Sequence, residues 1–323
     1  GPRDADGLSL WYRLVNAGKR IVTLDLKTEA GRAALLALVA RADVLLESFR
    51  PGALEKLGLG RAALAAANPR LIHCALSGYG QSGPLAGAAG HDINYMALGG
   101  GLAASGTEDR PVQAFPPTAD HASALQAVIA ILAALLRRER EGRGAVLDVS
   151  LLESVLAWQA LPITAALNRD PAVARGAGLL NGGAAFYRLY RTADGRFLSL
   201  GAIEPKFWEN FCRALGRPDL AARQGEPLPQ RDLIAEVERE VARFPLAHWE
   251  QVFAEVDTCA MPVVELAEVP EHPQIAARKL VSRGGGSHPW AAVGFPAWID
   301  GAPPAPRAEL AVATAEELLA AWR

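Results

Sequence analysis

Three side chains of this sequence have the chemistry for proton transfer: His91, Asp120 and Glu204. An imidazole that is neutral near pH 7 makes His91 the best general base available. Asp120 stands just before a long apolar run, where a carboxyl is expected to cap the start of a helix. There it would meet backbone N–H groups that stabilise negative charge. Glu204 follows a predicted strand and precedes a predicted helix, whose dipole favours an acid at that end. Each residue also has an ordinary structural interpretation, as a solvated histidine, a helix cap and a first-turn acid.

The other histidines and the cysteines do not form a metal-ligand pattern. No His-x-x-x-His or Cys-x-x-Cys spacing occurs, and three distant cysteines do not make a disulfide framework. The sequence therefore predicts no metal site and a reduced, cytosolic setting. The residues concerned are His73, His121, His248, His272, His288, Cys74, Cys212 and Cys259.

Composition limits the possible partners. The 323 residues are 50% hydrophobic and 21% charged, so a sizeable core can form and a disordered chain is excluded. A net charge of −2 argues against binding to nucleic acid or to an anionic membrane. The apolar run 122–136 is shorter than the roughly 20 residues that cross a bilayer, so we expect a buried helix. Residues 1–4 show no apolar signal-peptide region.

A glycine motif invites a nucleotide-binding interpretation. Residues 78–83 read Gly-Tyr-Gly-Gln-Ser-Gly and follow a predicted strand. Dinucleotide binding also needs a helix directly afterwards and an acidic residue about 20 positions on, at a strand end. Pro84 and further glycines follow instead. We therefore expect a tight loop that approaches a ligand or a neighbouring backbone.

The first half of the chain alternates strands and helices. Near-continuous apolar strands are expected at 21–25, 44–47, 71–76 and 146–149. The helices between them include one that Thr28 caps, a short one at 61–67, a long one at 121–140 and another at 151–167. This alternation predicts an α/β fold with a Rossmann-like parallel sheet. Basic residues near its loops, Lys19, Arg20, Lys27, Arg50 and Lys56, could together hold a polyphosphate at the sheet edge.

The second half predicts a smaller α+β domain. Residues 175–185 form a glycine-rich linker, and residues 186–202 read as a hairpin with an Asp194-Gly195 turn. Helices are expected near 205–215, 231–242, 246–256 and 314–322, with a Pro-rich loop at 289–306. We therefore expect a large α/β domain at 1–175, a small α+β domain at 186–275, and a C-terminal segment at 285–323 that returns to the large domain.

Several segments together resemble the family III CoA-transferase superfamily (the CaiB/BaiF group). The match runs over nearly the whole chain, and within the superfamily the sequence is most similar to α-methylacyl-CoA racemases. Gly90-His91-Asp92-Ile93-Asn94-Tyr95 and the segment 201–205 carry that second similarity. The general match rests on residues 19–27, 42–47, 49–52, 56–60, 78–84 and 142–144 with the strand that carries Asp148.

The resemblance implies roles for particular residues. His91 and Asp120 would transfer the proton, and Glu204 would support the site. The substrate would be an acyl-CoA thioester, with no further cofactor. The resemblance also implies an interlocked homodimer in which the small domain of one chain helps to close the site of the other. The implied CoA contacts are Leu26, Lys27, Arg50, Lys56, Leu57, Gly58, Gly90, Asp92 and Tyr95.

The sequence departs from the family pattern in three places. Lys56 stands where racemases carry Arg, which weakens a bidentate phosphate contact. His121-Ala122-Ser123 after Asp120 is closer to the transferases. The strand–helix–strand unit that usually opens the family fold is not found before Gly1.

Two reactions remain open, besides CoA binding without turnover. Epimerisation of a 2-methylacyl-CoA needs a base on one face of the α-carbon and an acid on the other, for which a neutral His91 and a protonated Asp120 are suited. In CoA transfer to a carboxylic acid, Asp120 would be the nucleophile and would pass through an aspartyl-CoA thioester. His91 and Glu204 favour epimerisation.

Overall fold

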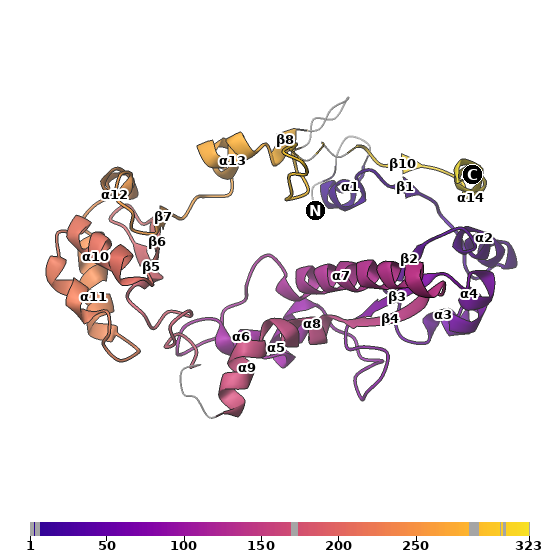
Figure 1. The fold of residues 1–323 in the computed structure, drawn as a ribbon, viewed down its shortest axis with the longest axis horizontal. Helices are drawn as coiled ribbons and strands as arrows, with labels where there is room; N and C mark the ends of the chain where they lie inside the picture. The colour runs from indigo at the N-terminus through magenta and orange to yellow at the C-terminus, as the bar shows by residue number, and fades with distance from the viewer. Residues whose placement is uncertain are drawn as a thin grey trace. The chain divides into compact units, whose positions relative to one another are not determined.

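A computed structural model describes residues 3, 7–168, 174–283, 291–303, 305 and 308–322 of the chain. These residues divide into two compact units (Figure 1). One unit combines residues 1–42 with 264–323, and the other contains residues 43–263. Each unit is described by itself.

The first unit joins the two ends of the chain through a short parallel pair, in which Arg20 is in register with Ala311. Thr28 Oγ1 accepts the N–H of Gly31 at 3.0 Å and caps helix α2, as expected. Thr314 caps the terminal helix α14 in a capping box with Glu317. The elements are α1 (Leu10–Asn16), β1 (Arg20–Ile21), α2 (Glu29–Val39), a 3-10 turn (Val269–Glu271), α13 (Pro273–Arg278), β8 (Val281–Arg283), β9 (Ala291–Val293), β10 (Ala311–Val312) and α14 (Ala315–Ala321).

The expected strand at 21–25 is wrong beyond Ile21. Asp25 ends the extended run because its carboxylate and carbonyl accept the N–H groups of Lys27 and Thr28 in a turn. The short strand that remains pairs with β10 and not with the central sheet. The Pro-rich stretch 289–306 also contains strand β9, which pairs with β8. Of the expected C-terminal segment, residues 285–290, 304, 306, 307 and 323 lie outside the described residues.

The central sheet of the second unit is parallel, in the order β2 (Val44–Glu47), β3 (Ile72–Ser77) and β4 (Ala145–Ser150). Val44 is in register with Ile72, and Ile72 with Ala145. The expected strands at 44–47, 71–76 and 146–149 are thereby confirmed. The helices of this part are α3 (Ala53–Lys56), α4 (Arg61–Ala67), α5 (Asp92–Leu98), α6 (Gly101–Ala104), α7 (Thr118–Glu141), α8 (Leu151–Trp158) and α9 (Ala160–Leu167).

Helix α7 is fastened to this sheet at its C-terminal end. The Arg138 side chain is 10% exposed and donates to Asp43 Oδ1 at 2.8 Å, so the end of α7 is tied to the start of β2. Gly142, with φ 72°, ends the helix in the left-handed region. The chain then passes so close to β3 that a Cβ on Gly144 would lie 2.8 Å from the backbone nitrogen of Leu71. Only glycine fits there.

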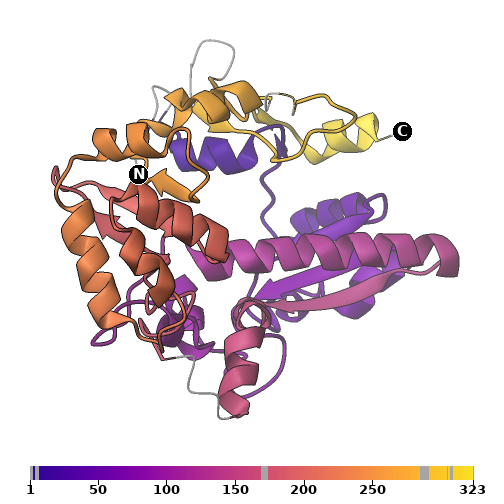
Figure 2. The same ribbon diagram turned by 60° about the vertical axis from the view of Figure 1, so that its left-hand side comes forward.

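One face of α7 packs on β3, β4 and α8, and Figure 2 shows the helix lying along the sheet. Among the described residues, α7 has the length and apolarity of a membrane span, because an 18-residue stretch within it has a mean hydropathy of 1.7. Helices of protein cores satisfy the same criteria, so this evidence is weak. The expectation of a buried helix is wrong for the other face of α7, which is exposed in this chain: Leu125, Val128, Ile129, Leu132 and Leu136.

The expected helix at 151–167 is in fact two helices, α8 and α9, that meet at Gln159. Pro162 has no N–H to donate to the carbonyl of Trp158, so the hydrogen-bond ladder is interrupted there. At the end of α8, the Gln159 N–H donates to the carbonyls of both Val155 and Leu156. This local break explains the change from one helix to two.

Residues 184–262, called here the hairpin segment, form an antiparallel sheet with helices packed on it. Tyr187 is in register with Gly201, and Gly195 takes φ 81° in the predicted turn. Trp208 and Phe211 are fully buried in its core and stack with centroids 5.7 Å apart. The elements are β5 (Tyr187–Arg191), β6 (Phe197–Gly201), α10 (Pro205–Ala214), a 3-10 helix (Pro218–Arg223), α11 (Arg231–Val241), α12 (Leu246–Phe253) and β7 (Ala260–Pro262).

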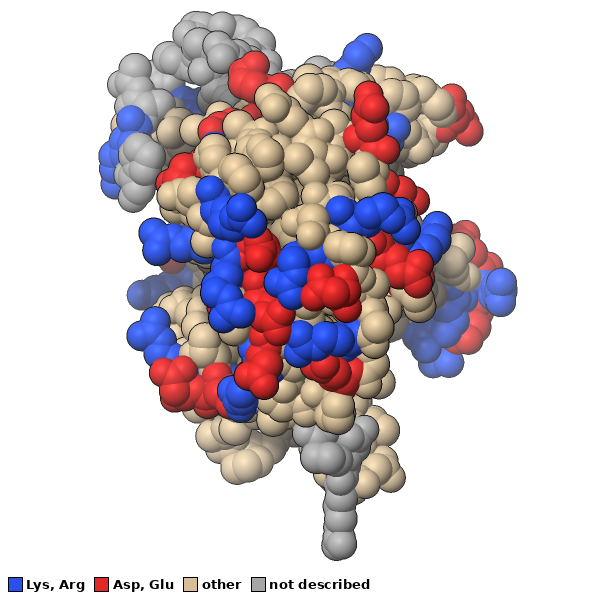
Figure 3. Space-filling model, turned by 90° about the vertical axis from the view of Figure 1, so that its left-hand side faces the viewer, with Lys and Arg blue, Asp and Glu red and all other residues tan. Residues whose placement is uncertain are grey.

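Charges of both signs alternate on the face that Figure 3 shows. The hairpin segment contains several ion pairs: Arg217 lies 2.6 Å from Asp219 and 2.8 Å from Glu236, and Arg223 lies 2.6 Å from Glu236. Because acid and base are paired, this face carries no patch of a single sign.

Candidate active site

The carboxyl edge of the central sheet gathers the loops that lead to the candidate site. Strand β2 runs into the loop with Arg50, and β3 runs into the glycine-rich loop 78–90. The Asp148 carboxylate on β4 holds that loop, since it accepts the Gln81 N–H at 3.0 and 3.2 Å. Open α/β sheets bind ligands at this edge. No helix follows Gly83 directly, so the motif at 78–83 lacks the context for dinucleotide binding, as expected.

Two tyrosines pack against the end of the glycine-rich loop. The rings of Tyr79 and Tyr95 meet edge to face with centroids 5.0 Å apart. Tyr95 is 6% exposed and shares a core cluster with Met96, Ala119 and Val155. Burial raises the pKa of Tyr95, and the charges of Tyr79 and Asp120 raise it further. The core under the site therefore lies within electrostatic reach of Asp120.

His91 and Asp120 come together because two helices begin at the same place. His91 is the N-cap of α5, and Asn94 Oδ1 accepts its N–H at 3.0 Å. Asp92, the first residue of α5, accepts the N–H groups of Ala119 and Asp120 on its Oδ1, at 2.6 and 3.2 Å. The start of α5 thus lies against the start of α7.

Asp120 does not cap α7 itself. The helix begins at Thr118 after Pro117, so Asp120 is its third residue, and the expected start at 121 is wrong. The proline side chain cannot accept a hydrogen bond, and Asp92 supplies the missing acceptor from α5. This long-range cap could not be found in the local sequence around Asp120.

The Asp120 carboxyl has an environment suited to an acid. Partial burial raises its pKa above that of an ordinary aspartate, although the residue as a whole is exposed, and the negative charge of Asp92 raises it further. His121 and His91 act in the opposite direction and lower this pKa. A carboxyl in this setting keeps its proton to a higher pH than a solvated one.

Glu204 lies elsewhere in the second unit. It is exposed, stands at the N-cap of α10 and precedes Pro205, at the end of β6. Burial raises the pKa of the Cys259 thiol, and the charges of Asp257 and Glu204 add to the effect. Among the described residues, no hydrogen bond or ion pair joins Glu204 to His91 or Asp120. The structure of one chain does not bring it into their site.

The candidate CoA contacts fall into three groups. Arg50 and Lys56 are exposed; Arg50 precedes helix α3, which follows β2, and Lys56 is the last residue of that helix. Leu57 is half-buried. Gly58 takes φ 73°, and the N–H of Leu59 donates to the Leu54 carbonyl at 2.8 Å, so helix α3 ends here. Gly90, Asp92 and Tyr95 line the junction of α5 and α7. Leu26 and Lys27 belong to the first unit, in the turn before α2.

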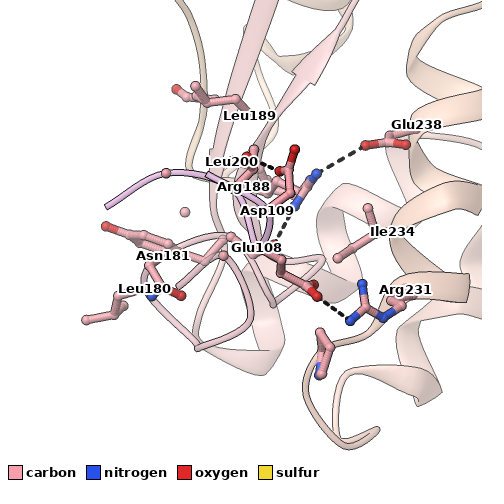
Figure 4. Close-up of a pocket in the computed structure, with 18 of the residues that line it drawn as sticks. Glu108, Asp109, Leu180, Asn181, Arg188, Leu189, Leu200, Arg231, Ile234 and Glu238 are labelled. Carbon is pink, nitrogen blue, oxygen red and sulfur yellow. Dashed lines mark hydrogen bonds and ion pairs between the residues drawn. The ribbon is translucent and has the colours of Figure 1, made fainter. Parts of the chain in front are cut away.

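A cavity of about 960 Å³ lies apart from these residues, between the loop 106–109, the linker 176–182 and the hairpin segment. Figure 4 shows two ion pairs in its wall, Glu108 with Arg231 at 2.6 Å and Arg188 with Glu238 at 3.5 Å. Sequence reasoning did not point to it. Its lining in the described part of the chain includes neither His91 nor Asp120. No cluster of three or more His, Cys, Asp or Glu side chains that could hold a metal occurs among the described residues.

The second unit is an α/β structure with a parallel sheet, in which Asp92 links the helix start after His91 to the helix start that carries Asp120. A family model, CoA-transferase family III, matches residues 1–310. The chain therefore belongs to CoA-transferase family III.

Known relatives include both kinds of enzyme. The chain is 41% identical over 267 residues to the alpha-methylacyl-CoA racemase of Homo sapiens, covering 79% of this chain and 68% of that protein. It is 33% identical over 288 residues to the acetyl-CoA:oxalate CoA-transferase of Acetobacter aceti, covering 86% and 73%. A CAIB/BAIF family protein from Brucella suis has a similar structure, with a TM-score of 0.84 at 26% identity, over 100% of this chain and 88% of that one. The resemblance to the superfamily and the α/β fold with parallel strands are thus confirmed.

Proposed function

We propose that this protein epimerises 2-methylacyl-CoA thioesters by 1,1-proton transfer at the α-carbon. The observation that carries the proposal is the junction of α5 and α7, where Asp92, the residue next to His91, accepts the N–H of Asp120 at 3.2 Å. His91 takes the α-proton from one epimer, and Asp120 delivers a proton to the opposite face. The roles reverse for the other epimer. The substrate must enter between two groups of opposite protonation state, which this pair can supply.

The environment of Asp120 supports the role of acid. Its raised pKa favours the protonated carboxyl that donates to the planar enolate. The same site offers the positive ends of two helices, α5 and α7, which favour negative charge on an enolate oxygen. The similarity to racemases at 41% identity agrees with this chemistry.

CoA transfer is the second candidate, favoured by relatives such as the acetyl-CoA:oxalate CoA-transferase at 33% identity. In this reaction the ionised Asp120 carboxylate attacks the thioester carbonyl and expels the CoA thiolate. That thiolate attacks the aspartyl carbonyl of the resulting acyl-aspartyl anhydride and releases the original carboxylate. The aspartyl-CoA thioester then transfers CoA to a second carboxylate through a second anhydride, which frees Asp120 again. The exposure of Asp120 is compatible with attack, but its raised pKa lowers the ionised fraction.

The deciding experiment uses one epimer of a 2-methylacyl-CoA in deuterated water without an acceptor acid. Epimerisation with deuterium uptake at the α-carbon supports proton transfer. Absence of exchange, together with a hydroxylamine-sensitive adduct and turnover only when a free carboxylate is added, supports CoA transfer. His91→Ala is expected to abolish most exchange. His248→Ala is the matched control, since that ring stacks on Phe244 in the hairpin segment at 4.1 Å.

Glu204 enters the proposal through a second subunit. Because it is exposed and unconnected to His91 within the described residues of one chain, we assign it to the site of the partner in a homodimer. Mixing inactive Asp120→Asn and Glu204→Gln chains should then restore part of the activity. Mixtures that stay inactive although subunits exchange would contradict shared sites.

The proposal further includes the two domains bounded as predicted, a cytosolic location, and CoA contacts at Leu26, Lys27, Arg50, Lys56, Leu57, Gly58, Gly90, Asp92 and Tyr95.

A further inference from the structure

One carboxylate connects the two segments that carry the proton-transfer pair. Asp92 is bonded covalently to His91, and its Oδ1 accepts the backbone N–H of Asp120 itself at 3.2 Å. The same oxygen accepts the N–H of Ala119 at 2.6 Å. A peptide bond on one side and a hydrogen bond on the other therefore link His91 to Asp120.

The start of α7 has a physical need for this acceptor. The first N–H groups of a helix have no partner within it, and Pro117 at the N-cap offers no side-chain oxygen. Ala119 is fully buried, so water cannot replace a lost acceptor at its N–H without rearrangement. A carboxylate is also the group that the positive end of a helix stabilises best.

We propose that Asp92 is a positioning residue that holds the helix start carrying His91 against the helix start carrying Asp120. The proposal rests on the proposed function of that pair. It differs from the CoA contact that the sequence suggested for Asp92, because the carboxylate is directed to the backbone of α7. Without it, the two helix starts lose their direct link, and the imidazole and carboxyl lose their fixed separation.

The charge of Asp92 has a second effect on the pair. The titratable groups that act on Asp120 are His91 and Asp92 from α5 and His121 from α7 itself, and Tyr95 of α5 lies within its field. Asp92 is the negative member of this set and raises the pKa of Asp120. An amide in its place keeps an acceptor oxygen and removes the charge.

The test compares Asp92→Asn, Asp92→Ala and the wild type. For Asp92→Asn we expect the limb of the kcat/KM profile that reports the ionisation of Asp120 to move to lower pH, because the negative charge that raises the pKa of Asp120 is removed. For Asp92→Ala we expect kcat to fall roughly 10- to 100-fold with a smaller change in KM, as for a displaced acid–base pair. Asp92→Asn should recover much of that kcat. Asp194→Asn is the matched control, because Asp194 accepts the N–H of Leu246 at the start of α12 in the same manner.

Several outcomes overturn the inference. If the pH profile and kcat of the Asp92 variants match those of Asp194→Asn, the positioning role is refuted. If only KM changes, the role is also refuted and Asp92 belongs to CoA binding instead. If the wild type shows no α-deuterium uptake, the proposed function fails separately. The inference is then decided by NMR titration of the Asp120 carboxyl carbon: Asp92→Asn should lower its pKa, and an unchanged titration refutes the link. Asp92→Asn serves this purpose even if Asp92→Ala does not fold.

Discussion

A single methyl group at position 90 should disturb both the fold and the reaction. A Cβ built on Gly90 lies 2.9 Å from Tyr79 Oη, 2.9 Å from Tyr95 Cε1 and 3.0 Å from Tyr95 Cζ. Since carbon atoms normally approach to about 3.5–4.0 Å, Gly90→Ala must displace the rings or the loop by roughly 0.5–1 Å. Tyr95 is almost fully buried, so its ring has little room to retreat.

The cost follows from these distances. Overpacking of this kind destabilises a protein by about 1–3 kcal/mol. For a unit of this size, the midpoint of thermal unfolding then decreases by between a few degrees and about 10 degrees. Gly90 directly precedes His91, so a shift of half an ångström also moves the imidazole. A displacement of about 1 Å can reduce a rate by about 100-fold, and we therefore expect roughly tenfold lower kcat/KM.

Gly87→Ala provides the control within the same loop. A Cβ at Gly87 meets no atom within 4 Å, so this variant should keep the stability and activity of the wild type. Thermal unfolding by circular dichroism and the α-deuterium exchange rate measure the two effects. Equal midpoints and equal rates for Gly90→Ala and Gly87→Ala would refute the packing argument.

Three further perturbations test other parts of the structure. Because folding raises the pKa of Asp120, the folded state binds this proton more tightly than the unfolded chain does. The free energy of unfolding therefore falls as the pH rises from the ordinary Asp pKa of about 3.9 to the raised pKa of the folded state. Asp120→Asn should therefore unfold at a higher temperature than the wild type at pH 7, with a difference that shrinks toward pH 4; a constant difference would contradict this sign. Asp148→Ala removes the acceptor of the Gln81 N–H and should cost about 1 kcal/mol in urea unfolding while KM for the CoA thioester rises; an unchanged KM would separate the loop from CoA binding. Trp208→Ala in the core of the hairpin segment should cost about 3–5 kcal/mol, and a loss below 1 kcal/mol would show that this core is not packed as described.

Local signals in the sequence were sufficient for many elements. Thr28 begins α2, Asp194-Gly195 turns the hairpin, and Gly142 ends α7, because each of these depends on neighbouring residues only. The apolar runs at 44–47 and 71–76 likewise led to β2 and β3, since a strand covered on both faces leaves little choice of composition.

Contacts between distant segments were not predictable in the same way. His91 is not a typical N-cap residue, so helix α5 was not expected after it. The cap of α7 comes from Asp92, 27 residues before Ala119, and no local pattern records that pairing. The pairing of β1 with β10 joins the two ends of the chain and is hidden for the same reason. His91 and Asp120 were found by residue type and resemblance, whereas their juxtaposition required coordinates.

The hydrogen bonds from Ala119 and Asp120 to Asp92 also make a built-in reporter. Amide protons in the first turn of a helix usually exchange rapidly with solvent, because nothing within the helix protects them. Here both N–H groups donate to Asp92, so their protons exchange when these two hydrogen bonds break. Their protection factors, read by mass spectrometry or NMR without any substrate, therefore measure how often the resting protein opens at this junction.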